Sequence, residues 1–468
     1  MAHAFRLPYP PALLLTVMSV SVLLLVAYEI EPGMVRMPML ASFAVMMVLI
    51  AFTSVELSIY LIIATTLLSP EIAVGSTSDD PNARGVTIRL DDVLLVLACL
   101  TWLFRMAITK ELNIVRRTPI NKPILLYWGA TVLATIFGFY QGYVSSKYGF
   151  FFVAKYLEYF ILFYVIVNDV HDNQTLHRYI IVLMITCLAA SLYGISEIGS
   201  VDRVSAPFEG PEGEPNTFGG YLMLMFSVSL GMFFEDDAKY KQRWLIMLGL
   251  TVLPLVFTQS RSSYLAFAVM ILCFVYCSAK RNILIIALLA GFVILPFIVP
   301  QEMVDRIMFT FHQGMQAGQI KLAQGVHLDT STSDRLLQWY KALMVYFPSH
   351  PLLGRGVTGA GFMDAQYARI LSESGLIGLA AFLWLLYRIG MIFNRGRKEL
   401  RDGRLRGIAL GGLCGFMGLL VHALGSNSFI IVRIMEPLMI LLGLVMAALL
   451  IQRQGMDRSD ADMEVSGP

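Results

Sequence analysis

Long stretches without a charged side chain constrain this sequence most. Residues 7–28, 123–146, 215–234, 282–301 and 407–432 contain no aspartate, glutamate, lysine or arginine. A helix of about 20 apolar residues crosses a bilayer, so each stretch is long enough for one span. Charged residues make up only 15% of the chain, against about 25% in soluble domains. We therefore predict an all-α polytopic membrane protein.

The apolar segments predict about 14 transmembrane helices. We expect them near residues 11–29, 37–53, 55–70, 91–108, 123–143, 150–168, 179–197, 217–234, 244–259, 262–279, 282–300, 373–392, 407–427 and 434–451. This predicts helices throughout 1–300, a large exterior loop at 301–372, three helices in 373–451 and a cytoplasmic tail at 452–468.

Basic residues are unevenly distributed between the expected loops. With both termini inside, the interior loops carry more than twice as many lysine and arginine residues as the exterior loops other than 301–372. Cytoplasmic loops are enriched in these residues. We therefore predict that the N and C termini are cytoplasmic.

The expected exterior loop is too long to be an ordinary connection, because structureless loops of this length are uncommon unless they are functional. Residues 334–347 place apolar side chains at helical spacing. Ser333 or Asp334 is the expected N-cap, and Pro348 and Pro351 are expected after the helix. This pattern predicts an amphipathic helix that lies on the outer membrane interface or caps the bundle.

Charge and cysteine usage exclude several other classes of protein. The net charge is only +2 and no long basic run occurs, so we expect no nucleic-acid partner. All five cysteines lie in apolar segments, which argues against an extracellular disulfide framework. Cys273 and Cys277 share a helix face, but no histidine or second cysteine pair accompanies them. Packing is therefore their expected role, and we predict no metal site.

Candidate site residues gather in three exterior segments. Arg203 precedes a Pro- and Gly-rich loop that leads to Asn216, Arg261 lies in a short turn between two spans, and the long loop carries Arg335 and Arg355. The planar fork of arginine suits bidentate binding of a diphosphate. An arginine at a helix end can instead extend to lipid headgroups.

Asp364 is the best candidate for a general base, because it precedes an expected helix that carries Tyr367. The alternative is that Asp364 only caps this helix, and Glu373 is a weaker candidate for the base. Residues 354–359 match G-x-G-x-x-G, but the dinucleotide fingerprint requires a preceding strand and a following helix. We therefore reject a dinucleotide site.

Two further patterns lie inside the predicted spans. Lys155 and Glu158 fall three residues apart on one helix, where their charges can neutralise each other. Gly411 and Gly415 have the spacing of small residues at close helix contacts, so this stretch indicates packing rather than a pore.

The order of the exterior pieces resembles the O-antigen ligase and O-antigen polymerase superfamily of bacterial envelope glycan assembly. The resemblance covers roughly residues 180–395. The matching pieces are Arg203, Pro215-Asn216, Ser260-Arg261-Ser262, Asp334-Arg335, Trp339, His350-Pro351-Leu352-Leu353-Gly354, Tyr367 and Glu373-Ser374-Gly375-Leu376-Ile377-Gly378.

The resemblance implies a C-type membrane glycosyltransferase of the bacterial inner membrane, with no nucleotide sugar, cofactor or required metal. The implied donor is an undecaprenyl-diphosphate-linked glycan and the implied acceptor is a glycan or lipid-linked hydroxyl, with membrane lipids and other polysaccharide assembly proteins as partners. Arg261 and Arg335 would hold the diphosphate, and Asp364 would deprotonate or position the acceptor. The expected substrate-binding residues are Arg203, Asn216, Arg355, Tyr367, Glu373 and Lys155.

Two alternatives stay open. Ligase members of the superfamily usually carry a His-Asn pair where this chain has Asp364-Ala365, which favours exopolysaccharide or O-antigen polymerisation over ligation to lipid A-core. A lipid-linked glycan flippase is the other hypothesis. Flippases usually have short exterior loops, whereas the informative polar residues here cluster in a long one.

Overall fold

The computed structural model describes residues 55–69, 71–76, 85–109, 116–209, 213–286, 289, 319–323 and 326–465. Over these residues the chain is a helical bundle with two short antiparallel hairpins, which are additions to the all-α fold that we predicted. The expected helices at 11–29 and 37–53, and most of the helix at 282–300, lie outside the described residues. The hairpins pair β1 (Glu71–Ser76) with β2 (Gly85–Arg89), and β3 (Lys321–Ala323) with β4 (Val326–His327).

The long helices lie close to the positions that the apolar segments predict. They are α3 (Val55–Leu68), α4 (Leu90–Thr109), α5 (Asn121–Tyr140), α6 (Ser146–Asp169), α7 (Asn173–Ser196), α8 (Pro215–Glu235), α9 (Lys241–Phe257), α10 (Arg261–Cys277), α15 (Gln366–Glu399), α16 (Gly403–His422) and α17 (Val432–Val465).

Within the described part of the chain, seven helices are long and apolar enough to cross a membrane. They belong to α5, α6, α7, α8, α15, α16 and α17. The apolar helices α3 and α10 are shorter. The protein is therefore a multi-pass membrane protein, while the count of 14 spans stays a prediction.

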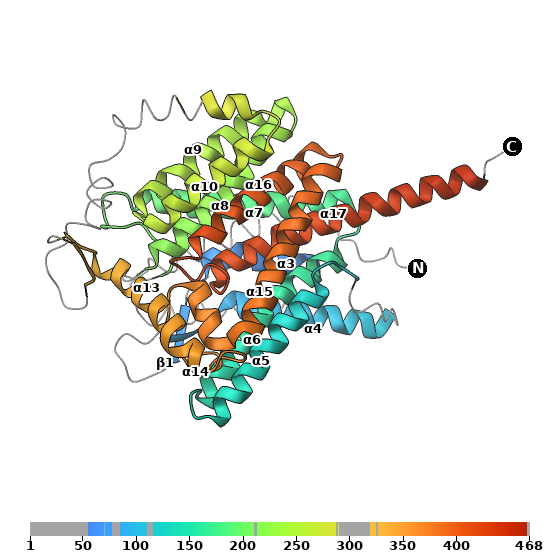
Figure 1. The fold of residues 1–468 in the computed structure, drawn as a ribbon. Coiled ribbons are helices and arrows are strands. Elements are labelled where there is room, and N and C mark those ends of the chain that lie inside the picture. The colour runs from blue at the N-terminus through green and yellow to red at the C-terminus, as the bar shows by residue number, and fades with distance from the viewer. Residues whose placement is uncertain are drawn as a thin grey trace, which may run out of the picture.

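Helices α8, α16 and α17 are the most buried of the membrane-spanning helices that the structure describes. Figure 1 shows α16 and α17 with α8, α9 and α10 on one side and α4, α5 and α6 on the other. The helix α13 (Thr330–Lys341) lies at one end of the bundle, which we call the α13 end, and the C terminus of α17 lies at the opposite end (Figure 1). Helices α8, α10 and α15 begin at the α13 end, where α16 finishes, so the ends of these helices can form one site.

Glycines allow α8 and α16 to pack closely. A Cβ atom added at Gly411 would lie 2.5 Å from the Ser227 carbonyl oxygen, and one added at Gly415 would lie 2.8 Å from a Leu224 methyl carbon. The Ser227 hydroxyl donates to the Gly411 carbonyl at 2.6 Å. The packing role predicted for these glycines is confirmed.

The amphipathic helix of the long loop is present, with different bounds. The first helical residue is Thr330 and the N-cap is Asp329, so our choice of Ser333 or Asp334 as the cap was wrong. The helix continues through a π-helical turn, Ala342–Tyr346, into the single turn α14 (Phe347–Ser349). Pro348 therefore lies inside the last turn, where an early helical position needs no N–H donor.

Helices α15 and α17 extend beyond the ends that the sequence predicts. Helix α15 begins at Gln366 rather than near 373, and it contains a kink at Gly375, whose φ of 62° is left-handed. Glycine adopts this conformation without the steric cost that a Cβ atom imposes. Helix α17 continues to Val465, through most of the segment expected to be a tail.

Candidate functional site

Helix α13 lies across the ends of three other helices at the α13 end. Its N-cap Asp329 reaches Arg261 at the start of α10, and Gln338 reaches the start of α15. Between them, Arg335 packs over Gly425, where an added Cβ would lie 3.4 Å from Arg335 Cδ. Trp339 Nε1 donates to the Leu424 carbonyl at 3.4 Å. One helix of the long loop therefore positions Arg335 against the segment that follows α16.

Arg261 is held in a specific orientation at the start of α10. Its Nη2 donates to Asp329 Oδ2 at 2.6 Å, and the side chains are 19% and 3% exposed. Burial by itself would raise the pKa of Asp329, but hydrogen bonds from Arg261 and Thr332, together with the charge of Arg261, outweigh it and hold this pKa below its ordinary value. Asp329 is therefore an ionised internal counterion for Arg261.

A chain of hydrogen-bonded polar side chains connects α8, α10 and α16 next to Arg261. The Ser260 hydroxyl donates to Asn216 Oδ1 at 2.8 Å, and the Ser263 hydroxyl donates to Ser260 Oγ at 2.8 Å. Nε2 of the buried His422 lies 3.2 Å from Ser263 Oγ, and its Nδ1 lies 2.7 Å from Ser428 Oγ. This chain fixes the start of α10 against the start of α8 and the end of α16.

Asp364 lies just before α15 and is half-buried, but it is not the N-cap residue. The N-cap is Ala365, which has no side-chain oxygen to offer. Gln338 Oε1 accepts hydrogen bonds from the backbone N–H groups of Asp364 at 2.8 Å and Ala365 at 3.2 Å. The amide of Gln338 thus contributes the acceptor at this helix start, and the structure argues against a simple capping role for the Asp364 side chain.

Two of the motifs that carry the family resemblance, at residues 350–354 and 373–378, lie in segments joined by backbone hydrogen bonds. The kink at Gly375 interrupts the helical hydrogen bonds around it, and the 350–356 loop replaces them. The N–H groups of Leu376 and Ile377 donate to the carbonyls of Pro351 and Leu352. In the other direction, the N–H groups of Arg355 and Gly356 donate to the carbonyls of Ser372 and Glu373 at 2.9 and 2.8 Å. These motifs therefore hold the loop to the kinked helix.

Glu373 has structural partners within this junction. Its Oε1 accepts from the Thr358 N–H at 3.0 Å and from Arg369 Nε at 3.0 Å, and both side chains of the ion pair are buried. The close approach of the 350–356 loop to Glu373 requires a glycine at position 354, because a Cβ atom added to Gly354 would lie 2.6 Å from the Glu373 carbonyl carbon.

The other residues predicted to bind substrate occupy several places. Arg203 Nε donates to the Thr258 carbonyl at 3.1 Å, beside the turn that carries Arg261. The Tyr367 hydroxyl donates to the Leu420 carbonyl at 2.8 Å, near the end of α16. Arg355 stacks on aromatic rings, with its guanidinium carbon 4.8 Å from the ring centre of Tyr143 and 4.6 Å from that of Tyr346. Arg203 is therefore a neighbour of the Arg261 turn, whereas Arg355 has its contacts near the end of α5.

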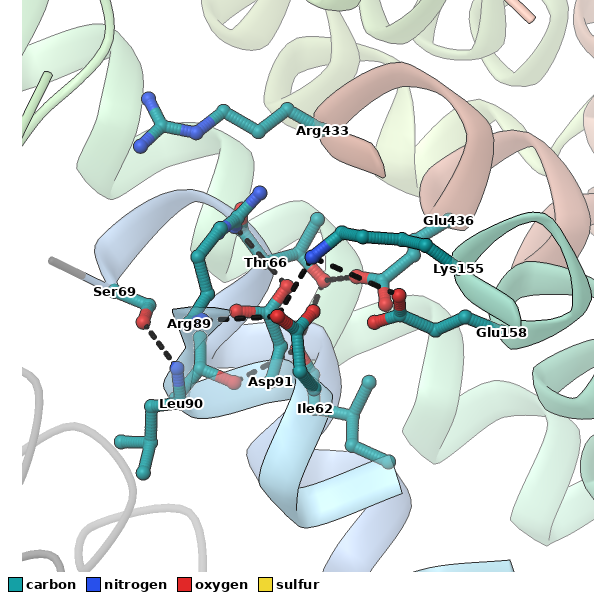
Figure 2. Close-up of polar contacts among 12 residues, drawn as sticks. Ile62, Thr66, Ser69, Arg89, Leu90, Asp91, Lys155, Glu158, Arg433 and Glu436 are labelled. Carbon is teal, nitrogen blue, oxygen red and sulfur yellow. Dashed lines mark hydrogen bonds and ion pairs between the residues drawn. The ribbon is translucent and has the colours of Figure 1, made fainter. Parts of the chain in front are cut away.

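Lys155 belongs to a separate polar cluster inside the bundle (Figure 2). Its Nζ lies 2.6 Å from Asp92 Oδ2 and 3.9 Å from Glu158 Oε2, which confirms the predicted pairing with Glu158. In the same cluster Arg89 pairs with Asp91, and the Thr66 hydroxyl donates to Glu436 Oε2 at 2.7 Å. Figure 2 shows Lys155 directed toward these carboxylates, so the structure gives this lysine a charge-balancing position.

The α13 site, which we define as Asn216, Arg261, Asp329, Arg335 and Asp364, combines features that suit an anion. Two arginine side chains come from different segments, and α8 and α10 both begin here. The N-termini of helices favour negative charge, and arginine binds phosphate in bidentate geometry. Sequence reasoning missed Asp329 and Gln338, although an acid directly before a helix start was an available signal for the first.

The architecture defines a polytopic membrane protein whose polar site lies at one end of the helical bundle. Residues 246–383, from α9 into α15, match the family model described as O-antigen ligase. This match supports the O-antigen ligase superfamily and confirms the resemblance inferred from the sequence. It also supports glycan transfer of the O-antigen ligase or polymerase type. No curated protein matches the chain significantly.

Proposed function

We propose that this protein transfers a glycan from undecaprenyl diphosphate to an acceptor hydroxyl at the outer face of the bacterial inner membrane. The favoured acceptor is another lipid-linked glycan, so that the reaction lengthens a polysaccharide. The observation that carries the proposal is the position of Arg261 and Arg335 at the start of α10 and on α13, within the segment that matches the O-antigen ligase family. Both termini would then face the cytoplasm.

The diphosphate would bind at the start of α10. In the structure Arg261 donates to Asp329, so an incoming diphosphate competes with an anion that is already part of the protein. The exchange would separate Arg261 from Asp329, the N-cap residue of α13. Arg261 and Arg335 then stabilise the negative charge that develops on the departing diphosphate.

Asp364 would act on the acceptor. Its backbone N–H donates to Gln338, which lies one helical turn along α13 from Arg335, and this proximity supports a role beside the proposed diphosphate site. As a general base it accepts the proton of the attacking hydroxyl while the bond between the sugar and the diphosphate breaks. Asp364-Ala365, in place of the His-Asn pair of ligases, favours polymerisation; ligation to lipid A-core is the second candidate.

The test is glycan transfer by the purified full-length protein in lipid nanodiscs with a lipid-diphosphate donor. Asp364→Asn preserves shape but removes basicity, so transfer should slow by about 10²–10⁴-fold while donor affinity is retained. Asp402→Asn is the matched control, since Asp402 caps α16 by accepting from the Leu405 N–H and asparagine caps equally well.

The products distinguish the candidate functions. Polymerisation gives a series of longer lipid-linked glycans, ligation gives glycan on lipid A-core, and a flippase moves the donor across the membrane without making a new glycosidic bond. Wild-type transfer rates in Asp364→Asn would remove the base role. Translocation without transfer by the unaltered protein would refute the whole proposal.

A further inference from the structure

Three cysteine side chains converge on the face between α10 and α16. Cys273 and Cys277 lie one turn apart on α10, and Cys414 comes from α16. Their sulfur atoms all lie within 4.8 Å of one another, and the Cys273 and Cys277 Sγ atoms are 3.9 Å apart. The helical spacing of Cys273 and Cys277 was visible in the sequence, whereas Cys414 is separated from them by more than a hundred residues.

The spacing of the sulfur atoms suits a single soft metal ion. A metal–sulfur bond length of about 2.3 Å places bound sulfurs about 3.8 Å apart in a tetrahedral site and about 4.0 Å apart in a trigonal one. The 3.9 Å separation of Cys273 and Cys277 lies between these values. Cys414 needs to move little, because its sulfur already lies within 4.8 Å of both.

The surroundings of the cluster favour bound thiolates. Arg397 Nη1 donates to the Cys277 carbonyl at 3.2 Å, and the positive charges of both Arg397 and Lys398 act on Cys277. Positive charge nearby offsets the negative charge of a three-thiolate site. Cys414 is buried, whereas Cys273 and Cys277 are half-buried, so an ion can enter from the α10 side.

We propose that Cys273, Cys277 and Cys414 bind one thiophilic metal ion, of the Zn²⁺ or Cu⁺ type. Thiolates select these ions over oxygen-preferring cations, and binding releases the thiol protons. Cu⁺ is satisfied by three sulfurs in a trigonal site, and Zn²⁺ takes a water molecule as a fourth ligand. The ion would link α10 to α16, and Arg261 of the α13 site begins the same α10 helix.

The experiment measures metal content rather than glycan transfer. The full-length protein is purified under reducing conditions, stripped with a chelator, and loaded with Zn²⁺ or Cu⁺ in separate samples. We expect one ion per chain and X-ray absorption that reports three sulfur ligands. Cys414→Ser should weaken binding about 100-fold or more, because even an outer-shell change costs 10–100-fold. Cys99→Ser and Cys187→Ser are matched controls that keep the cluster intact.

A second measurement uses the unaltered protein, in case Cys414→Ser does not fold. Bound metal should protect Cys273 and Cys277 from alkylation, with Cys99 as the internal reference for a half-buried thiol. Binding that survives Cys414→Ser, equal alkylation with and without metal, or a mass loss that reports a disulfide in place of bound metal would each overturn the inference.

Discussion

Replacing Arg261 with lysine separates the charge of this side chain from its planar shape. A lysine can still pair with the nearly fully buried Asp329, so the variant does not strand an unpaired carboxylate. Alanine is the poorer choice, because removal of one partner from a buried ion pair costs about 3–5 kcal/mol in stability. Arg261→Lys therefore tests the function of the guanidinium with the least damage to the fold.

The size of the effect follows from the contacts that the guanidinium can make. In the structure one of its nitrogens, Nη2, holds Asp329 at 2.6 Å. The lysine ammonium is a single point of attachment and cannot form two parallel bonds to a diphosphate. A hydrogen bond to a charged group contributes about 1.5–3 kcal/mol, so the loss of one lowers transfer by about 10- to 150-fold.

The assay is transfer in nanodiscs at near-neutral pH, with donor affinity measured separately. The depressed pKa of Asp329 means that the ion pair contributes stability above the unfolded-state value of about 3.9 and loses it as pH falls through the folded value. Neutral pH therefore leaves the pair intact. Asp329→Asn is the complementary variant: it removes the competing charge, while the asparagine amide oxygen can still accept from the guanidinium, so donor affinity should rise.

Two results would refute this reasoning. Wild-type transfer and donor affinity in Arg261→Lys would mean that only the positive charge matters, as expected for an arginine that anchors to lipid headgroups. A large loss of thermal stability in Arg261→Lys would show that the side chain acts through the fold, since lysine retains the charge opposite Asp329.

Three further predictions concern the fold. Reporter fusions near residues 115, 240 and 400 should report the cytoplasm and one near 325 the exterior; a cytoplasmic signal at 325 would contradict the proposed site. Lys155→Met should destabilise the protein by about 3–5 kcal/mol, read as a lower thermal midpoint, because Asp92 and Glu158 lose their cation. Gly411→Ala should destabilise by about 1–3 kcal/mol, whereas Gly249→Ala, with nothing within 4 Å, should not.

Much of the fold was predictable because the signal is local. The charge-free stretches placed the helices α5, α8 and α16 close to their observed positions, since the thickness of the bilayer sets the length of an apolar span. The Gly411 and Gly415 pattern predicted close packing, because only small side chains let two helix backbones approach. The helix in the long loop was visible through its periodicity, although its start at Thr330 was not.

For the candidate site, the sequence predicted which arginines take part but not the contacts that the site residues make. Arg261 stood out because a short turn between two apolar segments restricts its position, and this restriction is visible in the sequence. The environment of Asp364 was not visible, because the group that meets the start of α15 is Gln338 of a different helix. The same holds for Glu373, whose partners are Arg369 and the Thr358 N–H rather than a substrate.

The sequence by itself determined that the chain is a multi-pass helical protein with a long polar loop and with an arginine restricted to a short turn between two spans. These features are visible in the sequence because hydrophobicity and helical period act over neighbouring residues. Tertiary structure alone decided which polar groups meet. Asp329 reaches Arg261, the 350–356 loop replaces the hydrogen bonds broken at Gly375, and Cys414 joins Cys273 and Cys277. Each contact joins segments distant in the chain, so it depends on how the helices pack and not on the spacing of residues along them.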